Sequence, residues 1–287
     1  MWSPARQRWC RATRPFLVSL WGMNPNQQEL LALVSDWVAI PTVNPMGQQD
    51  RPDSGPYSTA MIEYLEAWLG RRGIACCRQP TPPGEANLVA TLPGRPGGPT
   101  IVFDAHIDTV PASDWSDRAF RPRMDGGRIY GRGACDTKGA LAAMLLAMAT
   151  VAETGTPPNT IRLIAPADEE YGQTGVQAFL ASGPTIDYAV VGEPRFLGGV
   201  EPSADNPFVR HAVSCCRSLL DPSRPVQSRG VNYGCHASAY AARGIPAVVI
   251  GPGDIAVAHA IDEYVEGESL VAAARIYHRI MSTPVGI

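Results

Sequence analysis

Several short polar clusters in the chain contain residue types that bind metal ions or transfer protons. One is the His-Ile-Asp sequence of His106 and Asp108, whose side chains point the same way on an extended backbone because they are two residues apart. A histidine that binds a metal commonly has a carboxylate behind it to fix its tautomer. A hydrogen-bonded surface pair would look the same, and short motifs give many false matches. The pair therefore needs support from the rest of the chain.

A second cluster is the glycine-rich segment 131–139, which contains Asp136 and precedes an apolar stretch with helical spacing. An aspartate in this position can simply cap the helix, which is a common role. The glycines indicate more than a cap, because they permit backbone conformations that side chains forbid. Asp136 is therefore a candidate for a functional loop.

Three further clusters each follow an apolar run: the acidic triplet 168–170, Glu193 in a Gly-Glu-Pro sequence, and His259 after a Gly-Pro loop. Crowded carboxylates repel one another and need cations or protons nearby. Taken singly, each cluster could also be solvated acids, a turn, or a histidine with an ordinary structural hydrogen bond.

The elements that would position these clusters are short apolar runs alternating with stretches of helical periodicity. The expected strands are 87–92, 101–103, 161–165, 188–191 and 247–250, and the expected helices are 30–38, 59–72, 139–151, 174–180, 207–220 and 269–281. This alternation predicts an α/β fold, a three-layer sandwich with a central mixed, mostly parallel sheet covered by helices on both faces. Ligands bind beyond the carboxyl ends of the strands in such sheets, so we expect the polar clusters to meet at that edge.

Together the clusters supply two histidines and several carboxylates, a donor set that suits zinc and related divalent ions. A carboxylate shared between two ions about 3.5–4 Å apart is the recurring arrangement of two-metal hydrolases. We therefore expect two divalent ions as cofactors, Zn²⁺ first and Co²⁺ as the alternative.

In order and wording, these motifs resemble the M20 metallopeptidase family, which includes acetylornithine deacetylase, succinyl-diaminopimelate desuccinylase, aminoacylase and carboxypeptidase G. The resemblance covers roughly residues 26–281 and implies a zinc-exopeptidase-like fold. It also implies five metal ligands in two sites: Asp136 shared by both, His106 and Glu193 at one, and Glu170 and His259 at the other.

The resemblance further implies two catalytic residues, Asp108 behind His106 and Glu169 as the general base for a metal-bridging hydroxide. It also suggests a cis peptide between Asp136 and Thr137. The amino-acid sequences of segments 134–139, 230–234 and 251–256 most resemble those of acetylornithine deacetylase-like members. We therefore expect hydrolysis of the amide bond of an N-acyl amino acid, and a small-molecule N-acyl amino acid or short peptide as the partner. An M20-type dipeptidase or carboxypeptidase is the nearest alternative, and a weakly active or inactive metal-binding remnant is the alternative of another class.

Two departures from the family pattern stand out. Members usually carry a lid domain of about 100 residues, a common domain size, which mediates dimerisation, but here it is expected to be absent near 197–200. The oligomeric state is open for that reason. The second departure is Cys235-His236, where relatives often have Thr-Asp or a similar small-polar pair. His236 is expected to be structural or solvated, with replacement of a lost oxyanion donor, or metal binding, as the less favoured readings.

Composition sets the remaining expectations. The net charge of −3 does not indicate nucleic acid or an anionic membrane as a partner, and we expect no apolar run long enough to span a bilayer. The seven cysteines lack zinc-finger spacing and are expected to be reduced thiols of a cytoplasmic enzyme of amino-acid metabolism. Residues 1–22 are expected to be a basic extension outside the fold, with the true start at Met23 and export as the less favoured alternative. Residues 23–287 are then one metallohydrolase catalytic domain.

Overall fold

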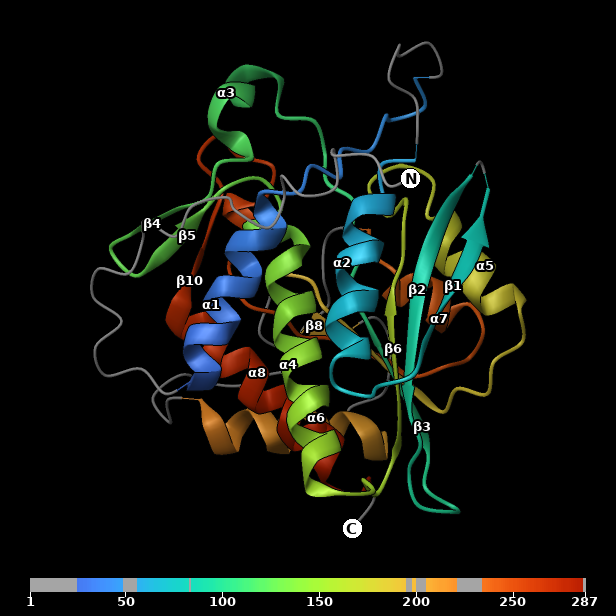
Figure 1. Ribbon diagram of the computed structural model, residues 1–287. Coiled ribbons are helices and arrows are strands. Elements are labelled where there is room, and N and C mark those ends of the chain that lie inside the picture. Colours follow the sequence, from blue (N-terminus) through green and yellow to red (C-terminus); the bar gives the residue numbers. More distant parts are fainter. Residues whose placement is uncertain are drawn as a thin grey trace, which may run out of the picture.

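A seven-stranded mixed sheet runs through the centre of the computed structural model (Figure 1). The structure describes residues 25–48, 56–82, 84–194, 198–199, 205–220 and 234–285, so the expected extension 1–22 lies outside the described residues. The helices are α1 (Pro25–Val38), α2 (Thr59–Gly70), α3 (Ser116–Ala119), α4 (Gly139–Thr154), α5 (Thr174–Ala181), α6 (Pro207–Leu219), α7 (Ala237–Ala241) and α8 (Gly267–Ser282). The strands are β1 (Cys76–Thr81), β2 (Glu85–Leu92), β3 (Thr100–Asp104), β4 (Arg123–Asp125), β5 (Arg128–Tyr130), β6 (Thr160–Ala165), β7 (Tyr188–Val191), β8 (Gly198–Gly199), β9 (Ala247–Val249) and β10 (Tyr264–Glu266).

The centre of the sheet is parallel and its margins are antiparallel. The strand order is β1-β2-β6-β3-β7-β9-β8, and β3 pairs in parallel with both β6 and β7, while β7 pairs in parallel with β9. The pairs β1–β2, β2–β6 and β8–β9 are antiparallel. Since β6, β3, β7 and β9 run the same way, their carboxyl ends lie at one edge of the sheet, which is where a ligand site is expected.

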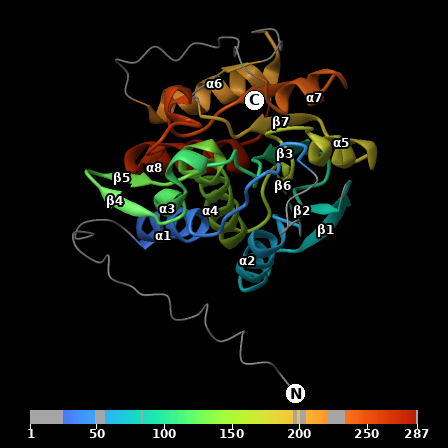
Figure 2. The same ribbon diagram turned by 90° about the horizontal axis from the view of Figure 1, so that it is seen from above.

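Helices cover both faces of this sheet (Figure 2). The alternation of side chains along β3 shows why, because Ile101 and Phe103 belong to the larger core with α1, α2, α4, α6 and α8, whereas Val102 belongs to a second core with α5 and α7. Successive side chains of a strand point to opposite faces, so a strand buried on both faces reads as a continuous apolar run. The predicted three-layer α/β sandwich is confirmed.

Helix α4 lies in the middle of the larger core, and most of its side chains are buried all round. The helical stretch Ala134–Thr154 is long and apolar enough to cross a membrane, so the expectation that no apolar run reaches that length is wrong. However, 94% of its most apolar window is buried inside the protein. This burial is typical of a core helix, and it explains the absence of a polar face in its sequence.

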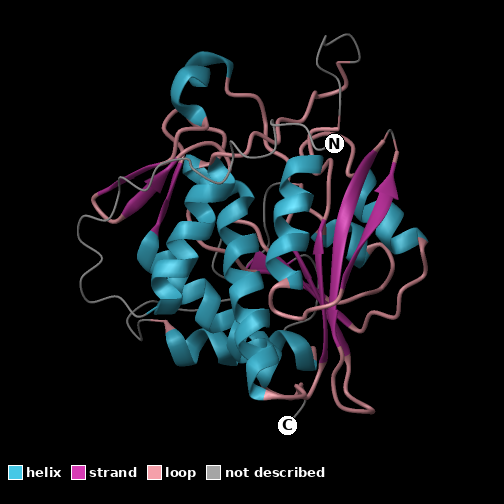
Figure 3. Ribbon diagram, viewed as in Figure 1, coloured by secondary structure: helices cyan, strands magenta, loops and turns pink. Residues whose placement is uncertain are grey.

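A three-stranded sheet of β10, β5 and β4 was not expected from the sequence, and neither were β1 and α7. This three-stranded sheet lies apart from the central sheet, on the other side of the helices (Figure 3). Its strands are three residues each, too short for a periodicity signal. The antiparallel pairing of β10 with β5 joins residues 264–266 to 128–130, which brings the chain after His259 next to the chain before Asp136.

The start of α4 is anchored by Lys138, which is the only lysine in the sequence and is completely buried. Its Nζ donates hydrogen bonds to the backbone oxygens of Trp37 (3.0 Å), in the last turn of α1, and Ile40 (2.8 Å), just after that helix. Burial lowers the pKa of Lys138 to about 7. The side chain therefore links two helices beneath the glycine-rich segment and does not face a ligand.

We expect Lys138→Met to destabilise the metal-free protein by about 1–3 kcal/mol, because two buried carbonyl groups lose their donor. Urea denaturation of wild type and variant measures the difference. Leu141→Met, a volume-conserving change one turn further along the buried helix, is the control and should cost less than about 1.5 kcal/mol. A Lys138→Met protein as stable as the control would contradict this role.

Candidate metal centre

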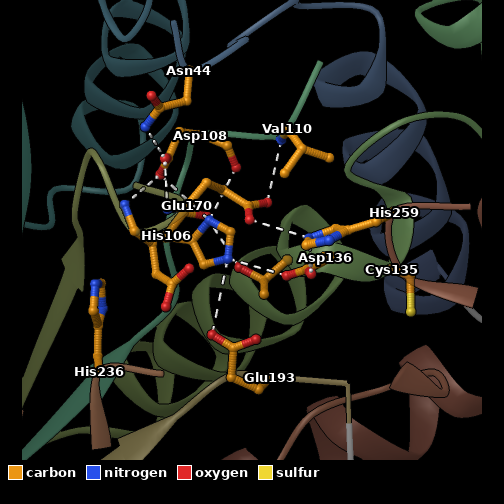
Figure 4. Close-up of polar contacts among 12 residues, drawn as sticks. Asn44, His106, Asp108, Val110, Cys135, Asp136, Glu170, Glu193, His236 and His259 are labelled. Carbon is orange, nitrogen blue, oxygen red and sulfur yellow. Dashed lines mark hydrogen bonds and ion pairs between the residues drawn. The ribbon is translucent and has the colours of Figure 1, made fainter. Parts of the chain in front are cut away.

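Five of the predicted side chains meet at the carboxyl edge of the sheet (Figure 4). They form two groups whose ligand atoms lie within 4.8 Å of one another and which share Asp136: His106, Asp136 and Glu193 in one, and Asp136, Glu170 and His259 in the other. These residues come from five separate segments of the sequence: four follow the parallel strands β3, β6, β7 and β9, and Asp136 lies in the turn before α4. Two histidines and three carboxylates are donors that suit a pair of divalent ions.

The first group is almost fully buried. His106, just beyond β3, has its Nε2 3.1 Å from Oδ1 of Asp136 and 3.9 Å from Oε1 of Glu193, which follows β7. The His106 Nδ1 lies 3.0 Å from the backbone oxygen of Asp108 and 3.4 Å from its Oδ1. In the tautomer whose Nδ1–H donates a hydrogen bond to Asp108, the Nε2 lone pair faces Asp136 and Glu193. A histidine that binds a metal needs a free lone pair of this kind.

The second group is more open, since the side chain of His259 is 52% exposed. The His259 Nε2 lies 3.2 Å from Oδ2 of Asp136 and 3.1 Å from Oε2 of Glu170. These two carboxylates raise the pKa of His259 to about 10. The two oxygens of Asp136 thus face different histidines, a geometry that allows one carboxylate to serve two ions.

The backbone around Asp136 explains the glycines of its segment. Residues Ala134–Lys138 form a π-type turn, with a cis peptide between Asp136 and Thr137 as the family resemblance implied. Gly133 has φ of 84°, and a Cβ there would meet Cγ2 of Thr109 at 2.8 Å. The N-cap residue of α4 is Lys138. Asp136 therefore does not cap this helix, which was the alternative role considered from the sequence.

Asp108 has more partners than the predicted contact with His106. Its Oδ1 accepts from the backbone N–H of Glu169 at 3.1 Å, and its Oδ2 accepts from that of Glu170 at 3.1 Å. The Nδ2 of Asn44 donates to Asp108 at 2.8 Å and to Asp168 at 2.9 Å. Asp108 therefore fixes the two glutamates as well as the histidine. Sequence reasoning missed Asn44, which has no diagnostic spacing from these acids.

Glu169 lies beside the two groups without belonging to either. Burial raises the pKa of Glu169 to about 7, although the charges of His106 and His236 oppose the rise. Burial also raises the pKa of Glu193, and the neighbouring charge of Asp136 adds to the rise. Buried carboxyl groups with raised pKa values are typical of sites that bind cations or transfer protons.

His236 forms a buried hydrogen-bond network beside the site, with its ring centroid 6.4 Å from that of His106. Its Nδ1 lies 2.9 Å from Oδ1 of Asp104, and the hydroxyl of Tyr240 donates to Oδ2 of the same carboxylate at 2.8 Å. His236 is in neither metal-binding group. The six cysteines of the described residues are all free, as expected for reduced thiols.

Comparisons with known proteins agree with this geometry. The model of peptidase family M20/M25/M40 matches residues 102–283. A succinyl-diaminopimelate desuccinylase of Variovorax paradoxus is 41% identical over 160 residues, 50% of this chain and 40% of its own length. An acetylornithine deacetylase of Proteus mirabilis is 30% identical over 180 residues, 61% of this chain and 45% of its own. The chain thus spans less than half the length of the curated relatives it matches.

Solved structures support the fold. An M20 family metallo-carboxypeptidase of Sulfolobus solfataricus superposes with a TM-score of 0.75 at 12% identity, covering 91% of this chain and 99% of the other. A tripeptidase of Staphylococcus aureus has a TM-score of 0.71 at 16% identity, covering 89% and 98%. The family match includes every residue of the two metal-binding groups, and the chain therefore belongs to peptidase family M20/M25/M40, whose members are metal-dependent hydrolases of amide bonds.

Proposed function

We propose that this chain is a two-metal hydrolase that cleaves the amide bond of N-acyl amino acids. The observation that carries the proposal is the pair of ligand groups sharing Asp136, with Glu169 alongside them. His106 and Glu193 would complete one ion site, and Glu170 and His259 the other. Zn²⁺ is the ion we propose, with Co²⁺ as the alternative, because mixed histidine and carboxylate donors suit both.

Bound divalent ions supply a water of lowered pKa and positive charge opposite the developing oxyanion. The protein supplies the proton acceptor. With its pKa raised to about 7 by burial, the Glu169 carboxylate can accept a proton from water near neutral pH and return it to the leaving amine. Asp108 holds the backbone of Glu169 and the ring of His106, so that acceptor and ligand keep a fixed relation.

Deacylation is favoured over peptidase activity by the pattern of similarity. The relatives named as desuccinylases and deacetylases match at 30–41% identity, whereas the solved peptidases match at 12–20% and support the fold alone. A small N-acyl amino acid is therefore the proposed substrate, in a cytoplasmic setting, and nucleic acid is not a proposed partner. Cleavage of short peptides is the nearest competing activity.

We also propose that the lid domain is absent near 197–200. The chain passes from the end of β7 at Val191 to the start of α6 at Pro207 with no room for a domain of about 100 residues. His259 is half-exposed on this chain. Without a lid, less protein surface would surround a bound substrate and more water would reach it. We therefore expect turnover to be weak and to favour small substrates.

The first test is metal content and turnover of the wild-type protein. After loading with Zn²⁺ or Co²⁺ and removal of excess ion, elemental analysis should find two ions per chain. Hydrolysis of N-acetyl and N-succinyl amino acids should exceed hydrolysis of dipeptides. Two ions with faster dipeptide cleavage would favour the peptidase, two ions without turnover would favour a metal-binding remnant, and no bound ion would refute the proposal.

Glu169→Gln should retain both ions and lose activity by about 10²–10⁴-fold, because the amide cannot accept a proton. The comparison is kcat and metal content of wild type and variant under the same loading. Glu153→Gln, an exposed acid at the end of α4, should behave as wild type. Undiminished kcat in the Glu169 variant would remove this residue from the mechanism.

Ion stoichiometry should follow the two groups. His259→Ala should bind one ion, since the group of His106 and Glu193 stays intact, whereas Asp136→Asn should weaken both sites because its carboxylate is shared. Calorimetric titration with Zn²⁺ measures the number of ions in each variant. Asp125→Asn, on an exposed hairpin strand, is the matched control. Two full sites in the Asp136 variant would show that the acid is not shared.

A further inference from the structure

A buried ion pair beside the site takes no part in the proposed chemistry. The Nη1 of Arg132 lies 2.6 Å from Oε2 of Glu263, and the two side chains are 4% and 0% exposed. Removing two charges from water is costly, and buried pairs often add little to stability. The other hydrogen bonds of the two side chains indicate what this pair does.

Glu263 holds the turn that carries the shared acid. Its Oε1 accepts from the backbone N–H of Cys135 at 2.9 Å and from that of Asp136 at 3.1 Å. Its own backbone oxygen accepts from the N–H of Gly131 at 2.8 Å. One residue therefore holds both the start and the middle of the glycine-rich segment, and its carboxylate binds the peptide groups adjoining the Asp136 side chain.

Arg132 holds the segment that carries the second histidine. Its Nη2 donates to the backbone oxygen of His259 at 3.2 Å and lies 3.4 Å from that of Pro111. His259 has φ of 62°, a conformation uncommon for residues other than glycine. The guanidinium group also lies over the ring of Trp115, at 5.4 Å from its centroid.

The charges of the pair fit this location. A lone carboxylate at Glu263 would stand close to the acid of Asp136 and repel it, and the guanidinium group of Arg132 compensates for that repulsion. A planar fork with several donors can bind Glu263 and the His259 carbonyl at once, which a lysine ammonium group cannot do with the same geometry.

We propose that Arg132 and Glu263 are positioning residues that set the separation of Asp136 and His259, and thereby control ion binding by the Asp136–Glu170–His259 group. This inference rests on the proposed function, because it assumes that the group binds an ion. The pair acts through hydrogen bonds to backbone atoms of the segments that carry Asp136 and His259.

Co²⁺ titration of the full chain, followed by calorimetry and visible absorption, tests the proposal. Arg132→Lys should bind the ion of the Asp136–Glu170–His259 group, here the second ion, about 10–100-fold more weakly, which is the usual effect of losing an outer partner of a ligand. Its affinity for the first ion, that of the His106–Asp136–Glu193 group, should not change. Glu263→Gln should weaken both ions, because the turn of Asp136 serves both groups. The absorption bands of the second ion should shift in each variant.

Hydrogen exchange of the metal-free protein gives a readout independent of ion binding. In Glu263→Gln the amides of Cys135 and Asp136 should exchange roughly tenfold faster, because the acceptor oxygen loses its negative charge and the new amide NH2 group opposes the Arg132 guanidinium group. Circular dichroism verifies that each variant folds. If Glu263→Gln does not fold, the titration of Arg132→Lys decides the question.

The matched controls are Arg118→Lys and Asp262→Asn. They alter an exposed ion pair, in which Nε of Arg118 lies 3.1 Å from Oδ1 of Asp262, the residue before Glu263 in the sequence. Both should bind Co²⁺ as wild type does. Wild-type affinity for the second ion in Arg132→Lys, or unchanged exchange in Glu263→Gln, would overturn the proposal while leaving the proposed function in place. Failure of the wild-type protein itself to bind Co²⁺ would instead refute the proposed function.

Discussion

Mutual repulsion among buried carboxylates is the constraint on which the site depends. Burial raises the pKa values of Glu169 and Glu193, and the neighbouring charges of Asp136 and Glu170 raise them further. In buried surroundings like charges cannot coexist without protons or cations between them. The two histidines supply part of that compensation and divalent ions would supply the rest. A chain folded only for stability would gain by replacing these acids with apolar residues.

The parallel centre of the sheet makes this concentration of charge achievable. Each strand is buried on both faces and contributes apolar packing, and each ends at the same edge, where polar side chains can leave the core. The acids are therefore held by strand ends, by the turn before α4, and by Asp108, which accepts hydrogen bonds from the backbone of both glutamates. Rigid elements carry the ligands, and short loops orient them.

Sequence patterns predicted the sandwich and the meeting of the polar clusters, because apolar runs ending in polar residues indicate both the strands and the edge at which they end. The choice of the five ligands among those clusters came from the family resemblance. The patterns did not predict Asn44, or the contacts of Arg132 and Glu263. Arg132 and Glu263 bind backbone atoms of distant segments, and a backbone partner leaves no pattern in side-chain types. Asn44 bonds the side chains of Asp108 and Asp168, which are far from it in the sequence and at no diagnostic spacing. The sheet of β4, β5 and β10 was missed for a related reason, since three-residue strands are defined by their partners.

The burial of Lys138 has a practical consequence. All the remaining residues in the Lys and Arg count are arginines, so the surface of the described residues carries no lysine amine. A protease specific for lysine has one cleavage point in the whole sequence, between the glycine-rich segment and α4, in the interior of the larger core. Cutting there requires the core to open, and it divides the chain into two fragments of nearly equal size. The native protein thus carries its own reporter of global unfolding.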